Sequence, residues 1–356
     1  MNLVIKKIEK KKIRNNTHAN NHSGVWYFTD NDSGLRGFVA IHRKYKNKPS
    51  IGGTRFFPYK TETQALNDAL RLSRAMSYKC VVSGLPYGGG KAVLIGDPSK
   101  LKSKALFKSY AQVIGHLNGI FYTGEDVGIE KADVQFMLRH AKFFVGKKDQ
   151  AGDPSPYAAE SVFDLILAAI KMEMPDKDPG EIRVAVKGLG KVGADLAGRL
   201  LRRGMKVVGA DVNANVVARL KKKFPQMRFV SPTAIARQAV DIYAPCALGN
   251  EFTKNSIKTI KAKIICGSAN NQLESSGIAT LLQKQGILFV PDYLANAGGL
   301  INVADELHPR GYNKDRVIKN IAKLESTFNT LYVASKREQK SMYAIAEKIT
   351  SQKVNC

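Results

Sequence analysis

The sequence is poor in cysteine, and its few cysteines form no pattern. The 356 residues include four cysteines: Cys80, Cys246, Cys266 and Cys356. No two of them form a CxxC pair, and none has a histidine at metal-ligand spacing. Neither a zinc site nor a disulfide framework is therefore expected. We expect reduced thiols and no bound metal.

Long apolar runs are also absent. No stretch approaches the roughly 18 consecutive apolar residues of a membrane span, and no apolar core of a secretory signal follows the charged N-terminus. That terminus, MNLVIKKIEKKKIRNN, is basic instead. We expect the first ~20 residues to form a frayed or surface-packed arm. The expected location is the cytoplasm, with no membrane partner.

Acidic residues are scarce relative to basic ones. The chain has 56 Lys and Arg against 30 Asp and Glu, a formal net charge of +26, and such a field attracts polyanions. The basic residues are nevertheless spread along the chain, so nucleic acid is not an expected partner. A non-catalytic protein that holds a polyanion stays as an alternative, and it predicts DNA binding that weakens steeply with salt.

The length and composition predict two folded domains. A chain of this length with 44% hydrophobic residues exceeds one ordinary core. From Gly24 to about Phe144, short apolar runs alternate with a helical stretch over Glu62–Tyr78, which predicts an α/β domain. The segment Gly146–Pro156, GKKDQAGDPSP, breaks this periodicity as an interdomain linker would.

After the linker, strands and helices alternate regularly. A helix over about Ala158–Met172 is followed by the apolar segments IRVAVK, KVVGAD, DIYAP, AKIICGSA and ILFVPD, with helices between several of them. This alternation predicts a doubly wound parallel sheet. The last segment is predicted to be helical. The expected bounds are 148–321 for the doubly wound domain and 1–147 plus 322–356 for the first domain.

A glycine-rich turn follows the first strand of the second domain. Gly188, Gly190 and Gly193 form a GxGxxG in VAVKGLGKVGADLAGRL, between a β-branched strand and a helix. These glycines allow a tight turn and close approach of the backbone to a pyrophosphate at the helix N-terminus. The next strand ends in Asp211, whose carboxylate can bind an adenosine ribose and would repel a 2′-phosphate. We therefore predict a Rossmann-type domain that binds NAD.

Two lysines stand in segments that would otherwise be buried: Lys79 in LSRAMSYK and Lys91 in GLPYGGGK. The glycines before Lys91 do not form a P-loop, because Leu85 and Ala92 replace its first glycine and its magnesium-binding hydroxyl. Asp126 in FYTGEDVG also follows an apolar run. Two cations and a carboxylate can bind an acid and move protons, provided that burial lowers a lysine pKa. The alternative is a pair of surface lysines beside loops.

Several motifs resemble those of one known family. The segments GGTR, LRLSRAMSYK, GGGKAV, EDVG, GDPSP, APCALG, GSANNQL and NAGGLINVADEL resemble, in order and spacing, the leucine, phenylalanine and valine dehydrogenases. The match covers nearly the whole chain from about Gly24. The resemblance implies an N-terminal α/β substrate and catalytic domain, a Rossmann-type NAD-binding domain, and oxidative deamination of an apolar L-amino acid. It also implies a homo-oligomer, a dimer or an octamer, whose contacts the first domain would carry.

The resemblance implies roles residue by residue. Lys79 would hold the substrate carboxylate, Lys91 would be the general base, and Asp126 would handle the amino-group proton. Gly52 and Gly53 would line the substrate site through close backbone approach. Two further residues would contact substrate or nicotinamide: Asn271 and Asn296.

Three positions depart from or add to the family pattern. Ala158 replaces a threonine that assists the nicotinamide end, which removes a hydrogen bond worth about 0.5–1.5 kcal/mol. Ser161 replaces a glycine on the same helix. Lys191, beside Val192 in the expected coenzyme turn, adds a positive charge that could strengthen attraction of the pyrophosphate.

Substrate choice is expected to depend on a small apolar set. By resemblance, the substrate side chain would be surrounded by Ile51, Gly124, Leu300 and Val303. We expect leucine and its branched-chain relatives. Gly124 leaves space where leucine-preferring members carry alanine, so an aromatic substrate such as phenylalanine or tryptophan, in a biosynthetic pathway, stays as the alternative.

Overall fold

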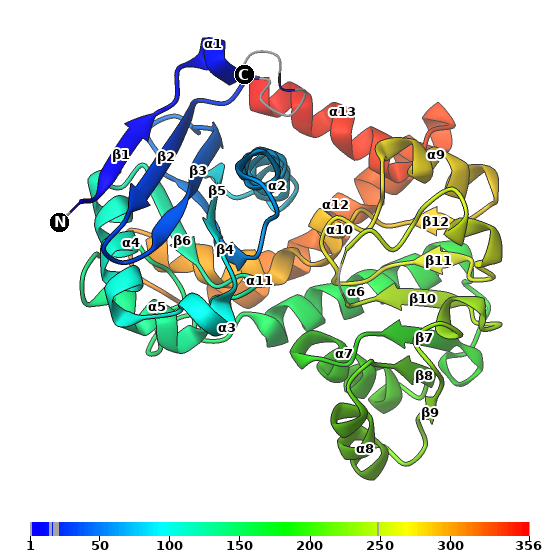
Figure 1. Ribbon diagram of the computed structural model, residues 1–356. Helices are drawn as coiled ribbons and strands as arrows, with labels where there is room; N and C mark the ends of the chain where they lie inside the picture. Colours follow the sequence, from blue (N-terminus) through cyan, green and yellow to red (C-terminus); the bar gives the residue numbers. More distant parts are fainter. Residues whose placement is uncertain (1, 14–15, 17–20, 248, 356) are drawn as a thin grey trace. The chain divides into compact units, whose positions relative to one another are not determined.

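The computed structural model of the chain describes residues 2–13, 16, 21–247 and 249–355, which belong to two compact units (Figure 1). Unit 1 takes in Met1–Asp153, Val303–Lys314 and Val354–Cys356. Unit 2 takes in Pro154–Asn302 and Asp315–Lys353. The first crossing between the units falls inside the predicted linker.

Unit 1 is built on a mixed six-stranded sheet in the order β1-β2-β3-β5-β4-β6. Its strands are β1 (Val4–Lys7), β2 (Gly24–Asp30), β3 (Leu35–Arg43), β4 (Ser50–Phe57), β5 (Gly88–Ile95) and β6 (Phe121–Gly124). The pairs β1–β2, β2–β3 and β3–β5 are antiparallel, whereas β4 is parallel to both β5 and β6. Lys91 therefore lies on a strand at the centre of this sheet.

Of the two forms expected for the N-terminal arm, frayed or surface-packed, its described part takes the surface-packed one. Val4–Lys7 forms the edge strand β1, and the short helix α1 (Lys10–Ile13) follows it. Apolar contacts explain this, because Leu3 and Ile5 are partly buried against the core of unit 1. Residues 14–15 and 17–20 of the expected arm lie outside the described residues.

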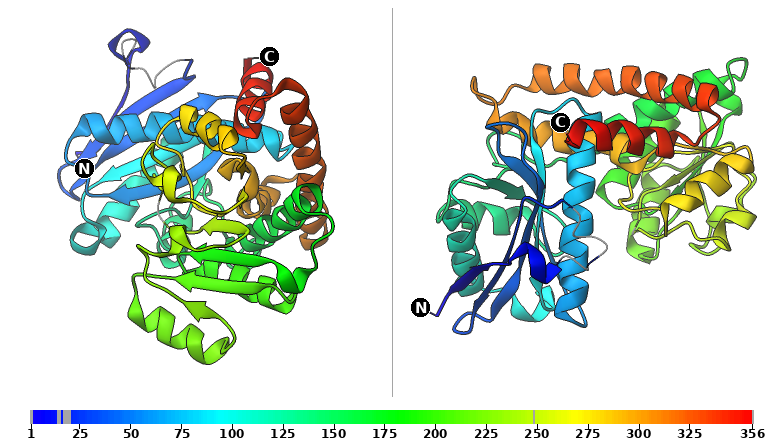
Figure 2. Two further views of the ribbon diagram at one scale, coloured as in Figure 1. Left: turned by 90° about the vertical axis from the view of Figure 1, so that its right-hand side faces the viewer. Right: turned by 90° about the horizontal axis from the view of Figure 1, so that it is seen from above.

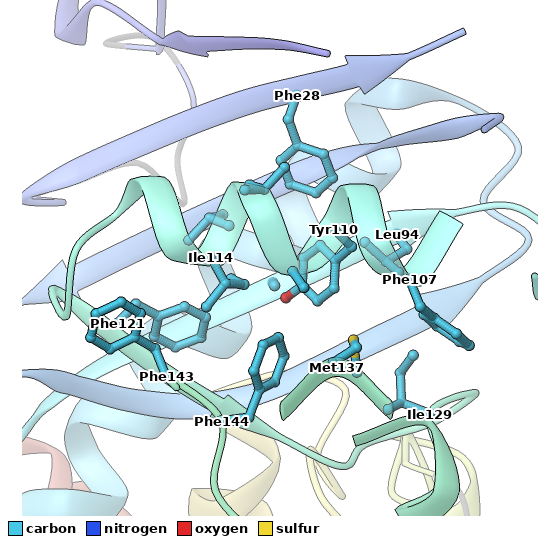
Figure 3. Packing of buried hydrophobic residues seen from close by; sticks show 14 of the residues in the cluster. Phe28, Leu94, Phe107, Tyr110, Ile114, Phe121, Ile129, Met137, Phe143 and Phe144 are labelled. Atoms are coloured by element: carbon cyan, nitrogen blue, oxygen red, sulfur yellow. The ribbon is translucent and has the colours of Figure 1, made fainter. Parts of the chain in front are cut away.

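Helices cover both faces of the first sheet (Figure 2). They are α2 (Glu62–Val82) on one face and α4 (Lys104–His116) with α5 (Lys131–Leu138) on the other, with the short α3 (Pro98–Leu101) between β5 and α4. The predicted helix over Glu62–Tyr78 is confirmed, and Thr61 caps it by accepting the N–H of Gln64 at 3.2 Å. Aromatic residues fill the layer beneath α4 (Figure 3), where Phe28, Tyr110 and Phe121 are fully buried.

Unit 2 is built on an all-parallel sheet in the order β12-β11-β10-β7-β8-β9. Its strands are β7 (Arg183–Lys187), β8 (Lys206–Ala210), β9 (Arg228–Phe229), β10 (Ile242–Pro245), β11 (Ile264–Ile265) and β12 (Leu288–Phe289). Numbered from β7, this is the order 3-2-1-4-5-6 of a dinucleotide-binding fold. The predicted doubly wound sheet is thus confirmed, and its strand order reverses between β7 and β10.

The remaining helices join these strands or follow them. They are α6 (Ser155–Glu173), α7 (Lys191–Arg202), α8 (Ala214–Lys223), α9 (Ser276–Lys284), α10 (Asp292–Ala295), α11 (Ala297–Ala304), α12 (Lys314–Glu338) and α13 (Met342–Asn355). The described residues also form the short 3-10 helices η1 (Pro179–Glu181), η2 (Ile235–Arg237), η3 (Ser256–Thr259) and η4 (Asp305–Leu307). Among the described residues, none of these helices combines the length and apolarity that a membrane span needs.

The C-terminal helices lie in a different unit from the one expected. The segment 322–356 was expected with the first domain, but its residues up to Lys353 belong to unit 2. The contacts explain why: the Tyr332 hydroxyl on α12 donates to Glu173 of α6 at 2.8 Å, and the ring of Tyr343 on α13 lies 5.7 Å from that of Tyr293. Both helices therefore pack on elements of the second sheet's unit.

Candidate active site

Lys91 lies on β5 and points into a charged cluster. Its side chain is only 8% exposed, and its ammonium forms an ion pair with the carboxylate of Asp126, in the loop after β6. A buried ammonium is tolerated when an opposite charge and hydrogen bonds replace its water. Two of the three groups predicted from the sequence are thus in direct contact.

A second cation holds the same carboxylate. Arg55, from β4, has its Nε 3.3 Å from Asp126 Oδ2, which is also the oxygen that Lys91 contacts. Its Nη1 lies 3.0 Å from Asp68 Oδ2 on α2, and Tyr59 donates to that same oxygen at 2.6 Å. The charges alternate along a row of four side chains, Lys91–Asp126–Arg55–Asp68.

Neither Arg55 nor Asp68 was predicted to belong to the site. Arg55 stands at the end of the GGTR motif, so a signal was present, but nothing in one sequence pairs it with an acid 13 residues later. Asp68 belongs to none of the motifs. Both side chains are largely buried, 17% and 12% exposed, and Arg55 joins Asp68 to the Lys91–Asp126 pair.

The cluster shifts the acid–base behaviour of its members. Burial alone would raise the pKa of Asp126, but the charges of Lys91 and Arg55 outweigh it and lower the pKa to about 2. Burial lowers the pKa of Lys91, and Arg55 lowers it further, while Asp126 acts in the opposite direction. Near neutral pH the site therefore combines an ionised carboxylate with a lysine that releases its proton more readily than an exposed one.

The C-terminal part of α2 packs against β5, the strand that carries Lys91. Lys79 is half-buried in the last turn of α2, and two residues earlier the Ser77 hydroxyl accepts the N–H of Gly89 at 3.1 Å. A Cβ on Gly89 would lie 2.0 Å from the Ser77 nitrogen, so glycine lets this helix touch β5. The helix end that carries Lys79 is thereby held against the strand that carries Lys91.

The two glycines of β4 have different surroundings. A Cβ on Gly52 would lie 1.9 Å from the carbonyl oxygen of Gly90, so the close approach there is to the neighbouring strand. A Cβ on Gly53 would lie 3.1 Å from Asp126 Cβ and 3.4 Å from Lys91 Nζ. Gly53 therefore keeps space open beside the ion pair itself.

Three of the four residues in the predicted apolar set are buried, and the space beside Gly124 is smaller than the sequence suggested. Ile51 is fully buried on β4, while Leu300 is buried and Val303 half-buried on α11. A methyl group on Gly124 would lie 3.2 Å from Val145 Cγ2 and 3.0 Å from its carbonyl oxygen. Val145 thus occupies much of the space that the sequence suggested was open at Gly124.

In unit 2 the predicted glycine turn lies where the strand order reverses. Gly188 has φ +90°, and a Cβ there would lie 2.6 Å from the nitrogen of Ala247, in the loop after β10. A Cβ on Gly193 would lie 1.9 Å from the Gly188 carbonyl oxygen, whereas Gly190 faces open space. Lys191 and Val192 begin α7, so its first amides are next to that open space. This arrangement fits a bound pyrophosphate.

Asp211 follows β8 and is held by backbone amides. Its Oδ2 accepts the N–H of Leu189 inside the glycine turn at 2.6 Å, and its Oδ1 accepts the N–H of Asn213 at 2.8 Å. The next residue, Val212, is 90% exposed. The carboxylate is therefore fixed beside the turn, where a coenzyme ribose would bind.

Asn296 and Asn271 complete the predicted set. Asn296 is buried, and its Nδ2 donates to the Ser268 carbonyl at 2.9 Å and to Asn270 Oδ1 at 2.8 Å. Its Oδ1 is buried without a hydrogen-bond partner among the described residues. Asn271, at φ +52°, accepts the N–H of Asn250 through its carbonyl. An unpaired buried acceptor fits the amide N–H of a nicotinamide carboxamide.

Comparisons with known proteins agree with this geometry. Two family models match: Glu/Leu/Phe/Val dehydrogenase, dimerisation domain, over residues 22–143, and Glutamate/Leucine/Phenylalanine/Valine dehydrogenase over residues 211–355. A leucine dehydrogenase of Geobacillus stearothermophilus is 39% identical over 334 residues, 93% of this chain and 90% of that protein. A valine dehydrogenase of Streptomyces albus is 39% identical over 338 residues, 94% and 92% of the two chains.

A solved structure is similar over almost the whole length. The L-tryptophan dehydrogenase from Nostoc punctiforme superposes with a TM-score of 0.79 at 34% identity, covering 97% of this chain and 98% of that one. The fold, the family models and the curated relatives agree. The chain therefore belongs to the Glu/Leu/Phe/Val dehydrogenase family of amino acid dehydrogenases.

Proposed function

We propose that this dehydrogenase oxidises an apolar L-amino acid, branched-chain substrates above all, to the 2-oxo acid and ammonia, reversibly and with NAD. The observation that carries the proposal is the buried Lys91–Asp126 ion pair, with Arg55 on the same carboxylate oxygen. This cluster offers a lysine of lowered pKa beside an ionised carboxylate. Deprotonation of an ammonium and activation of water both need such groups.

The first half of the reaction uses Lys79 and Asp126. The ammonium of Lys79 binds the substrate carboxylate, as the sequence resemblance implied. The carboxylate of Asp126 accepts a hydrogen bond from the substrate ammonium and takes its proton, so that the neutral amine can lose a hydride from the α-carbon. NAD, when bound, supplies the acceptor for that hydride.

The second half uses Lys91 as a base. The neutral amine takes a proton from a water molecule while the water oxygen adds to the carbon of the substrate iminium, which gives a carbinolamine. Lys91 returns that proton to the nitrogen and then takes the proton of the carbinolamine hydroxyl as the carbon–nitrogen bond breaks, so ammonia leaves and the 2-oxo acid remains. Burial and the charge of Arg55 favour this role because both lower the pKa of Lys91.

Coenzyme binding is assigned to unit 2. The turn at Gly188, Gly190 and Gly193, with Lys191 and Val192, would hold the pyrophosphate, and Asn296 with Asn271 would hold the nicotinamide end. The fixed carboxylate of Asp211 supports NAD over NADP, because a 2′-phosphate would meet a negative charge there. Comparing initial rates with NAD and NADP tests this preference.

The packing at Gly124 supports a branched-chain substrate. Val145 Cγ2 lies 3.2 Å from the position of a methyl on Gly124, and Ile51 is fully buried on the neighbouring strand, so the set is tighter than the sequence alone suggested. An aromatic substrate is the second candidate, because the chain is 34% identical to a tryptophan dehydrogenase. A methyl or methylene changes selectivity by only about 1–3 kcal/mol, so measurement must decide.

The deciding experiment follows NADH formation by absorbance with leucine, valine, isoleucine, phenylalanine and tryptophan. We expect turnover with at least one branched-chain substrate, and a fall in kcat of about 10²- to 10⁴-fold in Lys91→Ala. At least tenfold higher kcat/KM for phenylalanine or tryptophan than for leucine would favour the aromatic candidate. No reduction of either coenzyme by any amino acid would contradict the proposal.

We also propose that the enzyme is a homo-oligomer, a dimer or an octamer. The family model that matches residues 22–143 is described as a dimerisation domain, and it falls in unit 1. Light scattering after gel filtration tests this directly. A particle of 39.1 kDa, the mass of one chain, would contradict it.

A further inference from the structure

The hydroxyl of Ser161 joins α6 to the turn that contains Asn296. Ser161 is fully buried, and its Oγ lies 2.8 Å from the carbonyl oxygen of Ala295, to which it donates. The same Oγ accepts the N–H of Gly298 at 3.1 Å. It is also 3.0 Å from the Ala158 carbonyl of its own helix, a second acceptor for its single proton. The two long-range contacts therefore bracket Asn296 from both sides.

One of these contacts is a helix cap. Gly298 is the second residue of α11, and an amide in the first turn of a helix has no partner within that helix. Asn296 immediately precedes α11, and asparagine is among the best capping residues at such a position. The cap on Gly298 nevertheless comes from Ser161, which belongs to another helix.

The carboxamide of Asn296 is consequently used elsewhere. Its Nδ2 makes the two hydrogen bonds to Ser268 and Asn270 described above, and its Oδ1 is buried without a partner among the described residues. Leaving a buried acceptor unpaired costs about 1–3 kcal/mol, which capping α11 would avoid. The structure thus keeps Asn296 in a conformation that its local chemistry does not favour.

Close packing keeps the serine in place. A Cβ on Gly298 would lie 2.0 Å from the Tyr157 carbonyl oxygen and 2.9 Å from Ser161 Oγ, so α6 touches the start of α11 backbone to backbone. Gly299 continues this contact, since a Cβ there would lie 3.3 Å from the Pro154 carbonyl oxygen. A side chain as small as serine is needed between the two helices.

We infer that Ser161 is a positioning residue for coenzyme binding: it caps α11 in place of Asn296, so that Asn296 Oδ1 stays available to the nicotinamide carboxamide. The inference rests on the proposed function, which places the nicotinamide end of NAD at Asn296.

The test is a double-mutant cycle read out by NADH binding. Ser161→Ala is expected to weaken NADH binding, measured by fluorescence titration, by about three- to tenfold, the range for one lost neutral hydrogen bond. In an Asn296→Ala background, Ser161→Ala is expected to change the Kd by less than about twofold, because the positioned group is gone. A merely structural role for Ser161 would instead give the same loss in both backgrounds.

A crystal structure of Ser161→Ala gives a second readout that needs no coenzyme. In it we expect Asn296 Oδ1 to rotate to hydrogen-bonding distance of the Gly298 nitrogen. The matched control is Ser335→Ala on α12, which removes another buried serine hydroxyl, bonded to the Lys340 carbonyl at 2.6 Å. That variant is expected to lower Tm without changing the Kd for NADH.

The outcomes separate this inference from the proposed function. Wild-type Kd in Ser161→Ala, equal losses in both backgrounds, or an Asn296 side chain that stays turned away from α11 would each overturn the inference. Wild-type protein that binds neither NADH nor NADPH would overturn the proposed function, and with it the coenzyme part of the inference. Should Ser161→Ala not fold, Ser161→Gly, which also removes the hydroxyl and restores the residue of the family pattern, takes its place.

Discussion

Arg55 and Lys91 lie on neighbouring strands and contact the same oxygen of one carboxylate. The Nε of Arg55 is 3.3 Å from Asp126 Oδ2, the atom that the Lys91 ammonium also contacts. Two cations on one oxygen keep Asp126 ionised and, at the same time, make a proton on Lys91 less stable. Arg55 is therefore expected to influence catalysis without touching the reacting atoms.

Replacing Arg55 by glutamine removes one of the two cations. The pKa of Lys91 is then expected to rise, because Arg55 lowers it in the wild type. A general base must be neutral, so the rising limb of kcat/KM against pH is expected to move to higher pH. The rate at neutral pH is expected to fall by about 10- to 150-fold, the range for a hydrogen bond to a charged group.

The control for this prediction is Arg71→Gln, which removes the other arginine on Asp68, 2.9 Å from its Oδ1, without touching Asp126. It should leave the pH profile in place. A profile that is unchanged in Arg55→Gln would show that Arg55 does not tune Lys91.

Gly53 is predicted to be intolerant of a side chain for a local reason. A Cβ there would lie 2.9 Å from the Glu125 carbonyl oxygen, 3.1 Å from Asp126 Cβ and 3.4 Å from Lys91 Nζ, so Gly53→Ala would push the ion pair apart. A displacement of the reacting groups by about 1 Å can cost ~10²-fold in kcat/KM. Gly180→Ala is the matched control because nothing lies within 4 Å of its Cβ position. Equal activities of the two variants would contradict this prediction.

A buried histidine pair is predicted to make the protein sensitive to acid. The rings of His22 and His42 are 4.9 Å apart, and His42 is 5% exposed. Burial, followed by the charges of His22, Arg43 and Arg74, lowers the pKa of His42 from 6.5 to about 3. Between about pH 6.5 and pH 3, His42 is therefore protonated in the unfolded chain but neutral in the folded chain. The free energy of unfolding consequently falls as the pH drops through that range.

The expected slope is at most about 1.4 kcal/mol of unfolding free energy per pH unit within that window. In His42→Phe this slope should flatten. Phenylalanine is chosen because His42 Nδ1 has no hydrogen-bond partner among the described residues, so the substitution loses no hydrogen bond at that atom. Urea unfolding at about pH 5 and pH 7 measures the difference. The exposed His116, replaced by glutamine, serves as the control. Parallel curves for wild type and His42→Phe would refute the assignment.

Much of unit 2 could be predicted from the sequence because its signals are local. The GxGxxG turn, the acidic residue after β8 and the strand–helix alternation each lie within a short stretch of chain. Unit 1 was harder, and β4 was not predicted as a strand: Gly52 and Gly53 weaken the strand pattern, yet contact with Gly90 requires the first of them. The Arg55–Asp68 pair depends on how α2 packs on β4, which no motif encodes.

The C-terminal helices give a second example. The last segment is helical as predicted, and on α12 the residues Ile321, Leu324 and Phe328 are buried. Helical periodicity shows which face is buried but not which partner buries it. The partner, α6, is identified only by tertiary contacts such as Tyr332 with Glu173.

Val145 is predicted to limit the size of the substrate side chain. Its Cγ2 lies 3.2 Å from the position of a methyl on Gly124, so the Val145 side chain fills space next to Gly124. Val145→Ala should open that space and raise the ratio of kcat/KM for phenylalanine to that for leucine by about tenfold. Val113→Ala, a buried valine of α4, is the control for general loosening of the core.

The two variants separate a local effect from a global one. Both truncations are expected to cost about 1–3 kcal/mol of stability, because each leaves a cavity in a packed layer. Only Val145→Ala should change the selectivity ratio, since Val145 contacts Gly124 and Val113 lies on another element of unit 1. An equal change in both variants would mean that the ratio follows core stability rather than the space at Gly124.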